Sequence, residues 1–126
     1  MIKTENMIIW GRDFELNIVF DCYAGEDITE EQEKALQTFL HHNEWIDKAK
    51  EKVEKYCKKD VLADKENEKK DNIFSYIKPK SIYVDRNPKG VRVAILCHYR
   101  YDPEHGVAVI FSPKGDVTIG HEDDII

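Results

Sequence analysis

The sequence predicts a single α+β domain, in which two helices pack on one face of a twisted antiparallel sheet of about six strands. Three observations support this prediction. The length of 126 residues fits one domain, the middle of the chain has helical periodicity, and strand-like segments lie on both sides of it. We therefore expect residues 1–126 to form one unit, with an N-terminal hairpin and a C-terminal meander.

The first expected strands lie on either side of a short link at residues 11–13. The chain from 7 to 10 is apolar, and from Phe14 to Cys22 apolar residues alternate with residues that are mostly polar. The link contains Gly11 and suits a tight hairpin turn. The alternation predicts that Phe14 and the residues in phase with it face the core, with Glu15 and Asn17 toward water.

Two amphipathic helical stretches follow. Thr29 and Gln32 form the capping-box pattern that begins a helix, and a second apolar stripe runs from 43 to 58. The segment His41-His42-Asn43 is where we expect a break. Periodicity leaves open whether 29–42 and 43–58 are separate helices or one kinked helix.

The segment from 58 to 72 is almost entirely polar and predicts an exposed helical extension or a loop. Residues 73–77 are expected to form one last helical turn, because Pro79 disfavours a helix at Lys78. Four strands separated by turns rich in Pro and Gly are then expected at 81–86, 91–101, 107–112 and 116–120.

The predicted core combines apolar residues from both strand regions and both helices. Charged replacements at these positions should unfold the protein. The expected core residues are Ile8, Trp10, Leu16, Ile18, Phe20, Leu36, Phe39, Leu40, Ile46, Val93, Ile95, Val109 and Phe111.

Charge and cysteine content narrow the function classes. The chain has 19 basic and 25 acidic residues, a net charge of −6, which argues against a nucleic-acid partner. The same charge would favour a basic protein partner, although a contribution to solubility alone is the favoured explanation. No stretch approaches the roughly 20 apolar residues that span a membrane, and the N-terminus lacks the apolar core of an export signal. Three widely spaced cysteines predict neither disulfides nor a zinc site, which fits the cytoplasm.

The densest polar cluster lies on the expected turn at 102–106, with Asp102, Glu104 and His105. Its residues suit a metal or acid/base site of a small hydrolase, with His98 or His121 brought close, but Asp-Pro with a nearby Gly is also what a tight turn requires, and the interpretation as a plain turn is favoured. No catalytic motif, cofactor motif or metal-ligand spacing occurs elsewhere. His41 and His42 lie about 100° apart on a helix, so they do not share a metal.

Two charged segments could contact a partner. The C-terminal acids Glu122, Asp123 and Asp124 could present a surface complementary to a basic protein, and they are equally compatible with a solvated end of the chain. Together with Asp102, Glu104 and His105 of the turn, they are the expected partner-binding residues. Basic residues at 78–92 form a strip in sequence, for which the interpretation as ordinary outward-facing residues is favoured. That strip comprises Lys78, Lys80, Arg86, Lys89 and Arg92.

The segment from 101 to 109, with its Asp-Pro-Glu-His-Gly turn, and the strand at 117–120 before the final acids resemble an uncharacterised bacterial domain family. That family also has an N-terminal strand pair and an intervening helical segment. Small acidic proteins of this type are suspected to be immunity or toxin-associated proteins, so the resemblance implies a protein-binding role and assigns no catalytic residue. We therefore expect a non-enzymatic protein-binding domain, with a small metal-dependent or acid/base hydrolase as the alternative.

Overall fold

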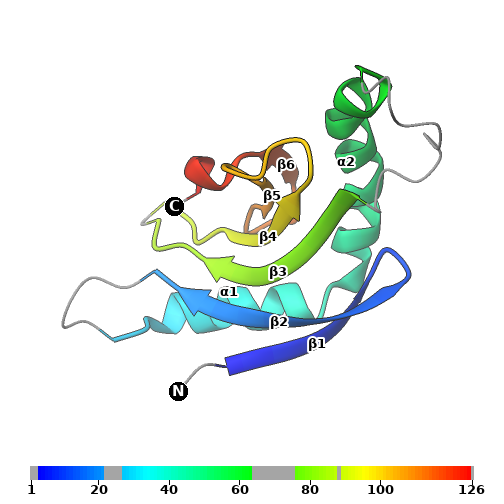
Figure 1. Ribbon diagram of the computed structural model, residues 1–126. Coiled ribbons are helices and arrows are strands. Elements are labelled where there is room, and N and C mark those ends of the chain that lie inside the picture. The colour runs from blue at the N-terminus through cyan, green and yellow to red at the C-terminus, as the bar shows by residue number, and fades with distance from the viewer. Residues whose placement is uncertain (1–2, 22–26, 64–75, 88, 126) are drawn as a thin grey trace.

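The computed structural model describes residues 3–21, 27–63, 76–87 and 89–125. These residues form one six-stranded sheet whose strand order follows the order of the chain. Both helices lie on the same face of the sheet (Figure 1). The elements are β1 Lys3–Ile9, β2 Arg12–Phe20, α1 Glu30–Leu40, α2 Asn43–Ala63, β3 Ile77–Val84, β4 Val93–Tyr99, β5 Val107–Phe111, β6 Val117–Gly120 and the 3₁₀ helix η2 Glu122–Asp124.

The predicted α+β class is confirmed, with one difference inside the sheet. Four of the strand pairs are antiparallel, whereas β2 and β3 run parallel, with Asn17 opposite Ser81. Parallel neighbours require a long crossover, and here the chain passes through both helices between these strands. The sheet is therefore mixed rather than wholly antiparallel.

The main core lies between the sheet and the helices. Leu16, Phe39 and Ile95 are completely buried, and the rings of Phe39 and Phe111 lie 5.1 Å apart between centroids. Most residues of the predicted core are buried or pack against this cluster. We call this side the covered face.

Ile8 is the exception, because 70% of its surface is exposed. Met7 and Ile9 are buried in its place, and Met7 lies opposite Phe14 in the β1–β2 register. A one-residue change of phase turns every side chain to the other face of a strand. The continuous apolar run at 7–10 gave no alternation from which to choose the phase.

The helices are two separate elements. Thr29 accepts a hydrogen bond from the Gln32 amide at 3.1 Å, and Gln32 Oε1 accepts from the Thr29 amide at 2.9 Å, which confirms the capping box. α1 ends with His41 as its C-cap residue, and α2 begins at Asn43 and continues to Ala63. The expected break at 41–43 is therefore confirmed. No helix among the described residues is long and apolar enough to cross a membrane.

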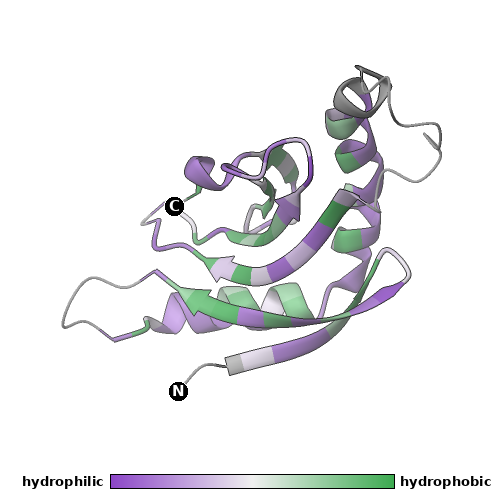
Figure 2. Cartoon of the chain, viewed as in Figure 1, coloured by the Kyte–Doolittle hydropathy of each residue, from purple (hydrophilic) through white to green (hydrophobic). Residues whose placement is uncertain are grey.

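The expected helical turn at 73–77 is only partly confirmed: Tyr76 is in a 3₁₀ conformation, but Ile77 is the first residue of β3, and residues 73–75 lie outside the described residues. β3 therefore starts before Pro79, and the register with β4 shifts between Pro79 and Ser81. Figure 2 shows hydrophobic and hydrophilic residues alternating along β3. The shift gives Lys80 the extra position of a bulge.

The opposite side of the sheet, which we call the open face, has a smaller apolar cluster. Tyr83, Leu96 and Ile110 from three neighbouring strands belong to it, and Ile125 packs on them from the C-terminal segment. The chain reaches this position through η2, which follows β6 directly. The C-terminal acids are therefore held over the open face, next to the β4–β5 turn.

Candidate functional site

The turn between β4 and β5 is held by Asp102. Its Oδ1 atom accepts a hydrogen bond from the His105 amide at 3.2 Å and lies 3.0 Å from His105 Nδ1. Its carbonyl oxygen accepts from the Gly106 amide at 2.8 Å. Gly106 has a φ of 63°, a conformation that favours glycine. These contacts orient the His105 ring toward the C-terminal segment.

η2 packs against this turn. The Glu122 amide donates to the His105 carbonyl at 3.1 Å, and the rings of His105 and His121 stack with centroids 5.2 Å apart. His121 Nε2 lies 3.6 Å from Asp102 Oδ2, and His105 Nε2 lies 4.0 Å from Asp123 Oδ2. We call Asp102, Glu104, His105, His121 and Asp123 the acid–His surface.

The pair Asp102–His105 shifts the titration of both groups. Partial desolvation acts to raise the pKa of Asp102, but the hydrogen bonds from His105 and the charges of His105 and His121 outweigh it and hold the pKa below its usual value. The hydrogen bond to Asp102, followed by its charge, raises the pKa of His105 above its usual value. The two groups therefore favour each other's charged forms.

Two of the predicted partner-binding acids have internal roles. Glu122 Oε1 forms an ion pair with Lys80 Nζ at 2.6 Å, and Asp124 Oδ2 accepts from the His121 amide at 2.8 Å. Glu104 and Asp123 are exposed, and Asp102 is partly exposed. The structure thus brings all six predicted residues to one edge of the molecule. The side chains of Glu104 and Asp123 are exposed to solvent there.

Apart from His121, the other histidines are separate from this surface. His121 is brought to Asp102, as one hypothesis required, but His98 lies on β4 opposite Lys78. His41 and His42 each place Nδ1 2.6 Å from a carbonyl of their own helix. Among the described residues, no group of three or more His, Cys, Asp or Glu side chains is arranged to hold a metal ion.

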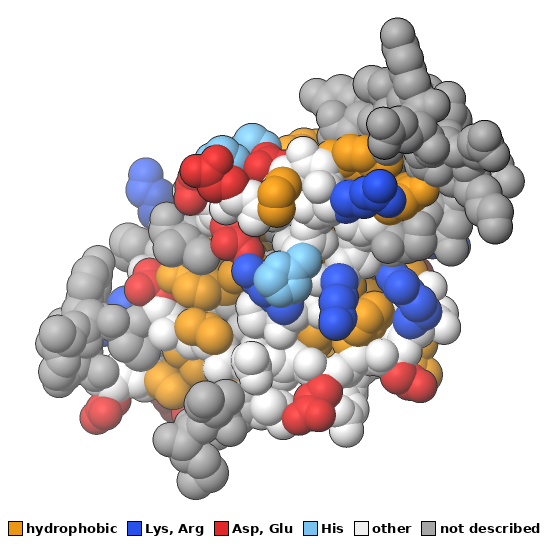
Figure 3. Space-filling model, viewed as in Figure 1, with side chains coloured by type: hydrophobic (Ala, Val, Ile, Leu, Met, Phe, Trp, Pro, Cys, Tyr) orange, Lys and Arg blue, Asp and Glu red, His pale blue; other side chains and the backbone are white. Residues whose placement is uncertain are grey.

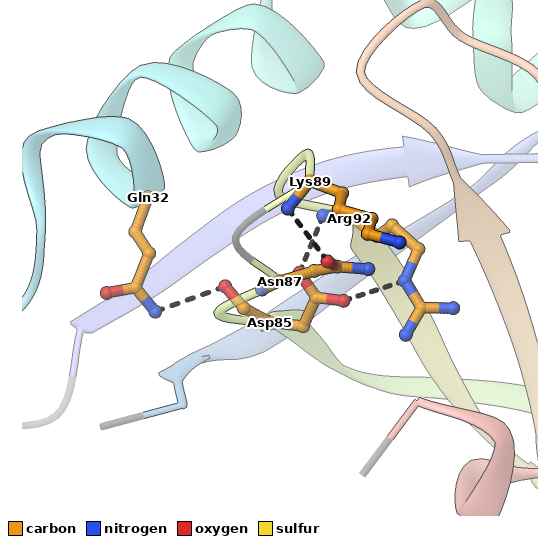
Figure 4. Close-up of polar contacts among 5 residues, drawn as sticks. All are labelled: Gln32, Asp85, Asn87, Lys89 and Arg92. Carbon is orange, nitrogen blue, oxygen red and sulfur yellow. Dashed lines mark hydrogen bonds and ion pairs between the residues drawn. The ribbon is translucent and has the colours of Figure 1, made fainter. Parts of the chain in front are cut away.

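A buried polar network joins α1 to the β3–β4 connection, and its burial was not predictable from the sequence pattern. Gln32 and Asp85 are 0% and 3% exposed, and Gln32 Nε2 donates to the carbonyls of Asp21 at 2.8 Å and Asp85 at 3.2 Å. Asp85 Oδ2 lies 2.7 Å from Arg92 Nε, and Asn87 Oδ1 accepts from the Lys89 amide (Figure 4). These contacts give the network a structural role.

The basic residues of the segment 78–92 differ in whether they form ion pairs. Lys80 pairs with Glu122 and Arg92 pairs with Asp85, so two of its cations are neutralised within the fold. Lys78 remains exposed on the open face. The five residues therefore do not all carry unpaired charge.

The described cysteines are core residues. Cys57 and Cys97 are buried free thiols, and burial, more than the neighbouring Cys57, raises the pKa of the Cys97 thiol. A raised thiol pKa lowers reactivity, which agrees with the expected packing role. Cys22 lies outside the described residues.

Comparison with known proteins gives one match. No curated protein and no solved structure matches the chain. The model of the family described as a domain of unknown function, DUF6985, matches residues 3–126. Because this match covers almost the whole chain, the expected relation to an uncharacterised domain family is confirmed, and the chain belongs to the DUF6985 family.

Proposed function

We propose that this chain is a non-enzymatic bacterial protein-binding domain of the immunity type, which neutralises a basic partner in the cytoplasm. The observation that carries the proposal is the acid–His surface, in which a hairpin turn and the C-terminal segment, distant in sequence, form one edge. A rigid edge with outward carboxylates suits recognition of a basic surface. The net charge of −6 adds long-range attraction to such a partner.

His105 makes the proposed contact dependent on pH. At neutral pH, the surface contributes Asp102, Glu104 and Asp123 as negative groups, facing His105 and His121. Protonation of His105 offsets part of that charge, and its raised pKa extends this effect to higher pH. Affinity for a basic partner is therefore expected to rise as the pH increases through the pKa of His105.

The test is affinity capture with matched variants. Wild-type protein is expected to retain a stoichiometric basic protein from cells that contain both, including any toxin encoded beside it. The variant with Glu104→Lys and Asp123→Lys reverses two exposed charges and should lose that protein. A control with Glu30→Lys and Glu51→Lys makes the same change in charge on α1 and α2 and should retain it.

The control variant distinguishes a contact at the acid–His surface from an effect of the net charge alone. Equal loss in both double variants would show that only the overall charge matters, and equal retention would show that another surface binds. Either result contradicts the proposal. Binding that weakens as salt is raised is expected in the wild type, because the contact is electrostatic.

The alternative is a small acid/base hydrolase, favoured by one contact. Asp102 holds Nδ1 of His105 at 3.0 Å, the geometry by which a carboxylate orients an imidazole as a general base. In this case purified protein would hydrolyse a member of a panel of chromogenic esters, and His105→Gln would abolish that activity while His41→Gln would not. Equal rates in all three proteins would remove this alternative.

A further inference from the structure

A second charged feature, of opposite sign, lies on the open face. It is a hollow of about 410 Å³ between the start of β3 and the end of β4. Figure 3 shows Lys, Arg and His side chains grouped near the middle of this face, with most Asp and Glu side chains toward its rim. The lining residues are Tyr76, Lys78, His98, Tyr99, Arg100 and Pro103, and we call this the cationic hollow.

Two of its side chains, Lys78 and Arg100, are cationic, and His98 lies beside them in the lining of the hollow. Lys78 and His98 stand directly opposite each other in the β3–β4 register, an arrangement that disfavours two positive charges. The structure shows no ion pair between Lys78, His98 or Arg100 and any described carboxylate. This contrasts with Lys80 on the same strand, which is paired with Glu122.

Arg100 is held in place by aromatic rings. Its guanidinium carbon lies 5.4 Å from the centroid of Tyr76 and 5.9 Å from that of Tyr101. Its amide also donates to the Tyr76 carbonyl at 3.0 Å, which ties Tyr76 to the end of β4. Stacking restrains a guanidinium through its flat faces and leaves the N–H groups at its edge for an anion. Because the rings already restrict the Arg100 side chain, this side chain loses less conformational entropy when a ligand binds.

We propose that the cationic hollow binds the phosphate group of a small phosphate monoester. Such a group carries about −1.5 to −2 charge at pH 7 and accepts several hydrogen bonds, which matches the fork of Arg100 and the point charge of Lys78. The Tyr76 ring and Pro103 provide apolar surface for the organic part of the ester.

This inference is independent of the proposed protein contact. The acid–His surface would bind a cation-rich partner through Glu104 and Asp123, whereas the hollow requires an anion and uses other side chains. Loss of one activity therefore leaves the other measurable.

The experiment is a titration followed by amide NMR of the full chain. Phenyl phosphate is expected to cause saturable shifts at His98, Tyr99 and Arg100, and inorganic phosphate to cause the same shifts with roughly tenfold weaker affinity. Chloride at matched ionic strength should leave these amides unchanged. Sulfate, which has similar shape and charge, separates general anion binding from a preference for phosphate.

Single-residue variants show whether binding depends on the side chains of the hollow. Arg100→Gln and Lys78→Gln should each weaken phenyl phosphate binding at least about tenfold, while Lys55→Gln on the exposed side of α2 should leave it unchanged. The amide spectrum also reports whether each variant is folded. Absence of saturable shifts in the wild type, equal affinity for phosphate and sulfate, or undiminished binding by Arg100→Gln would each overturn the proposal.

Discussion

The covered face and the open face of the sheet differ in what their side chains do. The cluster on the covered face draws on both helices and all six strands, whereas the cluster on the open face uses β3, β4, β5 and Ile125. Apolar burial is the dominant stabilising contribution in a small domain, so the covered face carries most of the stability. The open face can then hold unpaired charge at little cost to the fold.

The largest effect is expected from the covered face. Phe39→Ala removes a completely buried ring that contacts Phe111 and should lower the free energy of unfolding by about 3–5 kcal/mol. Ile8→Ala, at a side chain that is 70% exposed, should change it by less than about 0.5 kcal/mol. Urea unfolding measures both; similar losses would contradict the assignment of Ile8 to solvent.

The next largest loss of stability is expected at the β4–β5 turn, which packs closely against β4. A Cβ atom at Gly106 would lie 2.5 Å from the Cys97 carbonyl oxygen, whereas one at Gly11 would meet nothing within 4 Å, and both glycines have positive φ. Gly106→Ala should therefore cost about 1–3 kcal/mol more than Gly11→Ala. Thermal or urea unfolding compares the two, and equal costs would show that the turn yields without strain.

A smaller loss of stability is expected when the buried polar network is disrupted. Gln32→Ala leaves the carbonyls of Asp21 and Asp85 without their side-chain donor, at a cost of about 1–2 kcal/mol in the free energy of unfolding. Gln37→Ala makes the same chemical change at an exposed position of α1. If chemical denaturation finds the two variants equally stable, the network contributes nothing to stability.

The smallest effect is a pH dependence at the acid–His surface. His105 has a raised pKa, so its stabilising contribution is complete below its unfolded pKa and is lost as the pH rises through the folded one. Asp102 has a lowered pKa, so its contribution is present above its unfolded pKa and is lost as the pH falls through the folded one. The difference in melting temperature between wild type and His105→Gln should therefore be largest between about pH 4 and 6.5. A difference that stays constant from acid to alkaline pH would contradict the pairing.

Local signals in the sequence predicted the elements that depend on neighbouring residues. The capping box at Thr29, the break at 41–43 and the turn at 102–106 all appear in the structure. The phase of β1 was not predictable from an unbroken apolar run. Neither was the parallel pairing of β2 and β3, because it depends on how the crossover returns to the sheet.

The candidate sites were likewise only partly predictable from the sequence. The acids at 102–104 and 122–124 were visible as two charged segments, but their meeting depends on Ile125 packing on the open face. The depth of Gln32 and Asp85 follows from packing between α1 and the sheet, which the sequence pattern does not encode. The cationic hollow likewise requires the register that places Lys78 opposite His98.

We propose that a basic partner binds at the acid–His surface, and a map of the residues that contact the partner decides whether it does. Amide NMR of the labelled chain with the captured partner is expected to shift residues 102–106 and 121–125 and to leave α1 unchanged. Shifts confined to the helices, or to the amides of the cationic hollow, would contradict the claim.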